Sequence, residues 1–243
     1  MRLKSLIGRL LIALGFTVFA AASAMASGKG TITYRITVQN LTAGQAFTPP
    51  VVAIHNSRAD VFTTGEPASE GVRQIAENGD LGPLINALMS DPNVRSIYQG
   101  SAPLVPANNP GETGFSDSVS FELETDWWNR KLSFVSMLIC TNDGFTGADS
   151  VNLPYRKATY LLRAYETRTE ANTEDFADIV PPCQGLIGVS SDDAGTGASN
   201  PALAESGVII PHAGVVGDND LVERVHDWAD PVARITVERL SRR

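Results

Sequence analysis

Residues 132–140 read LSFVSMLIC, a run that is apolar on both faces of an extended chain. A strand covered on both sides has no polar face, so this run predicts a central strand of a sheet. Residues 31–40 read TITYRITVQN, in which Ile, Tyr, Ile and Val alternate with Thr, Thr, Arg and Thr. Strict alternation indicates a half-buried strand, with one face on a core and one face in water. The two runs together favour sheets packed on one another.

The remaining pattern adds strands and one helical segment. Over residues 68–88 the apolar period changes to that of a helix, with Ser69 as a candidate N-cap and Gly79 as a candidate stop, and a second short helical stripe follows at 84–89. Two stretches rich in Pro, Gly, Asn or Ser predict long surface loops. Strands dominate, so we expect a mainly β fold, an antiparallel β-sandwich with a short helical insertion. The further strands are expected at 51–56, 119–123, 160–165 and 233–240, and the loops at 102–114 and 190–207.

The first 26 residues have the features of a secretion signal. A basic start is followed by an apolar run from Leu10 to Ala22 and then by Ala24-Met25-Ala26, a small-x-small cleavage pattern. The alternative is a membrane anchor, which needs about 20 apolar residues. This run is shorter, so we expect cleavage, an exported chain in the periplasm or the medium, and no membrane insertion of the mature chain. Residues 27–243 are then expected to form a single domain.

The charge of the chain is acidic. Its 243 residues include 19 Lys plus Arg against 27 Asp plus Glu, a formal net charge of −8. Three of the basic residues lie within residues 1–26, so removal of that segment makes the chain more acidic still. Such a surface repels phosphate backbones, which argues against nucleic acid as a partner. The same carboxylates suit a hard cation.

Export of the chain would allow its two cysteines to form a disulfide. Cys140 and Cys183 are the only pair, and an oxidising compartment permits a disulfide. The bridge would close a loop of about 44 residues, worth about 4 kcal/mol in the chain-entropy treatment. Two buried free thiols are the alternative. A zinc site is disfavoured because no His or further Cys stands at zinc spacing.

Motifs of known catalytic sites are missing from the sequence. It contains no G-x-S-x-G elbow, no H-E-x-x-H, no Walker loop and no dinucleotide-binding glycine pattern. Of the three histidines, His55 falls in an apolar strand and is expected to be a satisfied core residue, whereas His212 and His226 lie near loops. We therefore expect a protein that is not an enzyme. An exported hydrolase that uses a His/Asp combination, and a metal-free structural protein of the envelope, remain as alternatives.

Several stretches carry recognisable motifs in a fixed order. Residues 53–56 (AIHN) precede 68–79 (ASEGVRQIAENG), and a strand at 132–137 runs into 142–153 (NDGFTGADSVNL), before 165–170 (YETRTE) and 231–236 (PVARIT). Together they resemble the spondin N-terminal domain, the module of F-spondin and mindin. The resemblance spans most of residues 31–240.

The resemblance implies a C2-like β-sandwich that binds calcium and acts in extracellular adhesion or recognition. Carried over by position, the family's metal ligands fall on Glu124, Asp143 and Glu166, with Asp149 in reserve, and one Ca²⁺ is expected. Glu166 stands where the family has Asp, and Arg168 replaces the glycine that follows. The implied partner is an unidentified extracellular protein or glycan.

Overall fold

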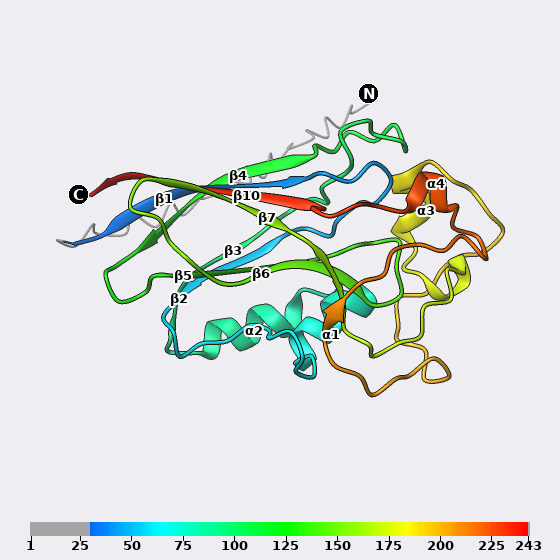
Figure 1. Ribbon diagram of the computed structural model, residues 1–243, viewed down its shortest axis with the longest axis horizontal. Coiled ribbons are helices and arrows are strands. Elements are labelled where there is room, and N and C mark those ends of the chain that lie inside the picture. Colours follow the sequence, from blue (N-terminus) through cyan, green and yellow to red (C-terminus); the bar gives the residue numbers. More distant parts are fainter. Residues whose placement is uncertain (1–29, 243) are drawn as a thin grey trace, which may run out of the picture.

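The computed structural model describes residues 30–242, and these form two antiparallel sheets that pack face to face (Figure 1). The β-sandwich expected from the sequence is confirmed. The predicted signal segment 1–26 lies outside the described residues. The four-stranded sheet has the order β4 (Ser118–Thr125), β1 (Ile32–Asn40), β10 (Ala233–Arg242), β7 (Lys157–Leu162). The six-stranded sheet has the order β3 (Val94–Gln99), β2 (Val51–His55), β5 (Lys131–Met137), β6 (Gly144–Asn152), β8 (Ala164–Glu166), β9 (Ile210–Pro211).

The main core lies between the two sheets. Tyr34 and Ile36 of β1 are fully buried there against Phe134 of β5, which is the face predicted by the alternation in β1. The other face of β5 is buried as well, because Val135 belongs to a second core beneath the helices. Strand β5 is therefore covered on both sides, and its prediction as a central strand is confirmed.

Two helices cover the outer face of the six-stranded sheet, α1 (Glu70–Asn78) and α2 (Gly82–Ser90). The Ser69 side chain accepts a hydrogen bond from the backbone N–H of Val72 in the first turn of α1. Gly79 ends the helix in the left-handed region, at φ 66°. Both predicted helix boundaries are thus confirmed. Gly71 allows the helices to touch, since a Cβ there would lie 2.7 Å from Cα of Leu84.

The chain between β8 and β10 forms an irregular region at one end of the sandwich, on the right in Figure 1. It holds a short 3-10 turn, η1 (Phe176–Asp178), and two short helices, α3 (Pro182–Ile187) and α4 (Glu223–His226). The predicted disulfide is confirmed: Cys140, just after β5, is bonded to Cys183 in α3. The bridge fixes this region to the end of the central strand.

The structure differs from the sequence prediction at three strands. Residues 144–152, for which no strand was predicted, form β6 at the centre of the six-stranded sheet. The strand expected at 160–165 is divided, because the chain leaves one sheet as β7 and enters the other as β8. Strand β3 was not predicted, since its sequence VRSIYQ has little alternation. Among the described residues no helix has the length and apolar character needed to span a bilayer.

Candidate functional site

The most deeply buried carboxylate of the described chain is that of Asp143, which lies between β5 and β6 with no exposed surface. Its Oδ2 accepts the backbone N–H of Thr169 at 2.8 Å and of Glu170 at 3.2 Å, and the hydroxyl of Thr167 at 3.0 Å. Its Oδ1 has no hydrogen-bond partner within residues 30–242. Buried polar atoms are nearly always paired, so one fixed, unpaired carboxylate oxygen is a feature that needs an explanation.

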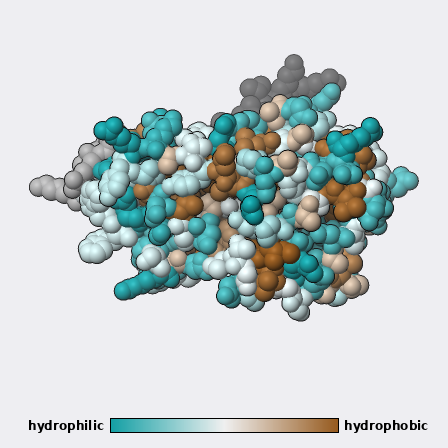
Figure 2. Space-filling view, viewed as in Figure 1, coloured by the Kyte–Doolittle hydropathy of each residue, from teal (hydrophilic) through white to brown (hydrophobic). Residues whose placement is uncertain are grey.

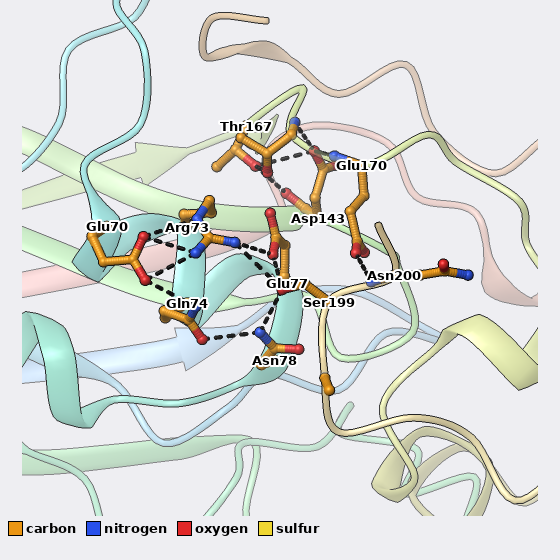
Figure 3. A network of polar contacts seen from close by, with 12 residues as sticks. Glu70, Arg73, Gln74, Glu77, Asn78, Asp143, Thr167, Glu170, Ser199 and Asn200 are labelled. Carbon is orange, nitrogen blue, oxygen red and sulfur yellow. Dashed lines mark hydrogen bonds and ion pairs between the residues drawn. The ribbon is translucent and has the colours of Figure 1, made fainter. Parts of the chain in front are cut away.

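Three more acids are buried beside Asp143. Glu77 of α1, Glu166 of β8 and Glu170 after β8 are only 5%, 7% and 4% exposed. Figure 3 shows the side chains of Glu77, Asp143 and Glu170 gathered between α1 and the segment that follows β8. Two arginines act on these acids: Arg73, with its Nη1 2.8 Å from Oε2 of Glu77, and Arg168, whose charge acts on Glu166. We call Glu77, Asp143, Glu166 and Glu170 the acidic cluster.

Burial perturbs the titration of this cluster. It raises the pKa of Glu170 to about 7, and the negative charges of Glu77 and Asp143 add to that effect. Burial also raises the pKa of Asp143, with the charge of Glu77 contributing and the hydrogen bonds to its carboxylate opposing. For Glu166, burial and then the charge of Asp143 raise the pKa. The pKa shifts of Asp143, Glu166 and Glu170 therefore oppose ionisation of these three acids, and a further positive charge among them would favour it.

The long loop 190–207 closes over the cluster. The N–H of Asn200 donates to Oε1 of Glu170 at 2.5 Å, and the hydroxyl of Ser199 donates to Glu77. Next to these contacts lies an open cavity of about 280 Å³, lined by Arg73, Glu77, Glu170, Ser199 and Asn200 among others. Two members of the cluster, Glu77 and Glu170, therefore line an open space at the surface.

The structure places two of the three expected ligands on adjacent strands. Gly144 pairs with Glu166 in the ladder between β6 and β8, and Asp143 lies opposite Thr167, so Asp143 and Glu166 are one residue apart in register. Glu124 is exposed in β4 of the four-stranded sheet, where it pairs with Thr33 of β1. Asp143 belongs to the six-stranded sheet. Glu124 lies at the end of the sandwich where β5 begins, whereas Asp143 lies beyond the other end of β5. The seven residues of β5 span about 20 Å, so Glu124 is too far away to share a cation with Asp143.

Asp149, the reserve ligand, also lies away from the cluster. It is exposed near the far end of β6, where the charges of His55 and Lys131 act on it.

Glu77 and Glu170 are the cluster members that the sequence analysis did not identify as ligands. Glu77 lies in the quoted motif at 68–79, directly before the Asn-Gly that ends α1. A local signal was available for it: an acid on the otherwise apolar face of an amphipathic helix, buried in the structure with Val72, Ile75 and Ala76. Glu170 had no such signal, because its burial depends on a loop 30 residues further along the chain.

A second acidic group lies in the irregular region. Asp175, Asp193 and Asp220 each offer an oxygen within 4.8 Å of the others, so this triad could hold a metal ion. Over the described part of the chain no other three His, Cys, Asp or Glu ligand atoms are this close. Two of these carboxylates already accept backbone N–H groups, and Asp193 is exposed. Acids in such exposed turns are common without any metal.

The histidines do not form an accessible catalytic pair. As predicted, His55 is a satisfied core residue, with Nδ1 2.8 Å from the carbonyl of Asn56 and Nε2 2.8 Å from Oγ of Ser133. Both His55 and Ser133 are buried. The ring of His212 packs edge-on against Trp228, with its Nδ1 accepting a backbone N–H.

Comparison with known proteins gives the family. The sequence model described as Spondin_N matches residues 39–166, more than half of the chain. Glu77, Asp143 and Glu166 all fall within this match. The comparison with curated proteins returned no match. The Spondin_N family consists of non-enzymatic extracellular domains, which agrees with the β-sandwich and the disulfide. The chain therefore belongs to the spondin N-terminal domain family.

Proposed function

We propose that the protein is an exported recognition module of the spondin type, acting in adhesion, and that one Ca²⁺ binds at its acidic cluster. The unpaired, fully buried Oδ1 of Asp143 carries the proposal. An oxygen held in place by three hydrogen bonds to its neighbour, among other buried acids, is a preorganised ligand for a cation.

The donor set favours calcium over other metals. The cluster offers carboxylate oxygens, with the hydroxyl of Thr167 and the amide of Asn172 close by, and neither nitrogen nor sulfur ligands of His or Cys. Calcium takes six to eight oxygen ligands at 2.3–2.6 Å in flexible geometry. Asp143 would be the anchor, with Glu77, Glu166 and Glu170 supplying further oxygens and water completing the shell. Glu77 thus takes the position for which Glu124 was expected.

The cation would join parts of the chain that are distant in sequence. Glu77 lies on α1, Asp143 follows the central strand, and Glu166 and Glu170 belong to β8 and the segment after it. Since Glu77 and Glu170 also hold loop 190–207, a bound ion would order that loop. An ordered loop beside an open cavity is a suitable surface for an extracellular partner.

Calcium titration calorimetry tests the proposal. The parent protein should bind one Ca²⁺, and Asp143→Asn, which keeps the shape of the side chain, should abolish that binding. Glu124→Gln is the matched control, because it removes one exposed carboxylate at the other end of the sandwich and should bind as the parent does. Retained binding in Asp143→Asn, or its loss in Glu124→Gln, would refute the assignment. Asp220→Asn tests whether the triad in the irregular region holds the ion instead.

A further inference from the structure

The end of the sandwich opposite the acidic cluster carries an exposed aromatic group. Two turns meet there, residues 126–130 between β4 and β5 and residues 153–156 between β6 and β7, at the left in Figure 1. Trp127 is 42% exposed, Tyr155 74% and Trp128 85%. Large aromatic side chains this exposed are uncommon in a folded chain unless they contact a partner.

The turn that carries Trp128 is fixed. Oδ1 of Asp126 accepts the backbone N–H of Trp128 at 2.8 Å and of Asn129 at 3.0 Å. The other oxygen of Asp126 lies 3.5 Å from Nε of Arg95. Across the described chain the indole of Trp128 makes no ring stacking or cation–π contact. A rigid turn therefore holds the indole out in solvent, which lowers the entropy lost when a ligand binds.

Two arginines lie against the neighbouring rings. The guanidinium of Arg130 is 5.5 Å from the ring centre of Trp127 and 5.0 Å from that of Tyr155, and Arg239 is 5.5 Å from Trp127. Within residues 30–242 neither arginine forms an ion pair with a carboxylate. In a chain with 27 acids, two adjacent arginines without an acidic partner form a local positive site.

We infer that this end of the sandwich binds an acidic glycan. The apolar face of a sugar ring fits the exposed indole of Trp128, and a sugar carboxylate is the group that a guanidinium such as that of Arg239 pairs with in bidentate fashion. The inference names a ligand for the proposed recognition role, on which it rests. It is independent of the cation, because the acidic cluster lies at the opposite end.

A lipid bilayer fits the same end less well. Membrane anchoring buries aliphatic as well as aromatic side chains, and neither turn contributes an exposed aliphatic residue. Figure 2 shows this end coloured mainly teal and white, with the larger brown groups in the middle and toward the other end. Apart from the buried Leu153, the residues of the two turns are polar, aromatic or proline, as a hydrated sugar requires.

Binding of a short oligogalacturonate, followed by tryptophan fluorescence and calorimetry in EDTA, tests the inference. The parent should bind it, should bind a neutral malto-oligosaccharide of equal length at least tenfold more weakly, and should lose affinity with added salt. Trp128→Ala should weaken binding at least tenfold with an unchanged unfolding midpoint. Phe115→Ala, which removes an aromatic ring 43% exposed elsewhere, is the matched control and should bind as the parent does. Arg239→Gln should weaken binding of the acidic sugar only.

Three outcomes would overturn the inference. They are no binding of oligogalacturonate by a folded parent, equal binding by Trp128→Ala, and Trp128-dependent binding to vesicles of phosphatidylglycerol and phosphatidylethanolamine in place of the sugar. Since the assay contains EDTA, its result is separate from that of the calcium titration. A protein that binds calcium but not the sugar would leave the proposed function standing and remove this inference alone.

Discussion

The pH dependence of stability without calcium is the sharpest test of the acidic cluster. Glu170 has its pKa raised from 4.5 to about 7 in the folded state, so the folded chain holds a proton that the unfolded chain releases. This contribution to stability is present below about pH 4.5 and is lost as pH rises to about 7. The shift corresponds to at most about 3 kcal/mol, and solvent in the adjoining cavity reduces that figure.

The assay is thermal unfolding in EDTA at pH 5 and pH 8. At pH 8, Glu170→Gln should unfold at a higher temperature than the parent, by up to roughly 6–12 °C since 1 kcal/mol shifts a chain of this size by about 2–4 °C. At pH 5 the two proteins should differ little. Glu124→Gln, an exposed acid, should match the parent at both pH values. If Glu170→Gln is no more stable than the parent at pH 8, the cluster is not electrostatically strained and the reasoning fails.

Calcium should reverse this pH effect, because a bound cation favours the ionised acids. The calcium-induced rise of the unfolding midpoint should therefore be larger at pH 8 than at pH 5. A calcium concentration of 100 times Kd should add about 2.7 kcal/mol to the free energy of unfolding. Replacing Cys140 and Cys183 by Ala should cost about 4 kcal/mol, measured by urea unfolding against the oxidised parent. Gly71→Ala should destabilise the chain by about 1–2 kcal/mol, since the new Cβ would meet Leu84 and this clash outweighs the gain in helix propensity. Ser69→Ala should cost about 1 kcal/mol through loss of the helix cap; equal midpoints for parent and variant would contradict either helix prediction.

The strands that the sequence predicted are those whose burial is regular. Strand β1 faces the core on one side and β5 on both, so residue spacing alone distinguished them. Strand β6 failed this test because its Gly, Thr and Asp resemble a loop. Its glycine at 147 is required by packing, since a Cβ there would lie 2.7 Å from both the Phe134 carbonyl and the Phe62 ring. Such close approach between distant residues leaves no periodic trace in the sequence.

The acidic cluster was predictable only in part. Asp143 and Glu166 were identified through the family motifs, and the β6–β8 ladder places them on adjacent strands. Glu124 was matched by its distance from the central strand along the chain, but β4 belongs to the other sheet. Glu77 reaches the cluster from α1, the helix that covers the outer face of the six-stranded sheet. Position along the chain cannot indicate a contact that forms only when a helix, two strands and a later loop fold together.

The irregular region between β8 and β10 is held to the sandwich by two unlike kinds of contact, among others. One is the covalent bond between Cys140 and Cys183, and the other is the set of contacts of Glu77 and Glu170 with loop 190–207. Thiols stay reduced in the cytosol and pair outside it, and extracellular calcium modules are tuned to the high calcium levels found outside cells. Under the proposed function, export supplies both conditions at once. The irregular region between β8 and β10 would then complete its folding only after crossing the membrane, and a copy retained in the cytosol would present this region to proteases.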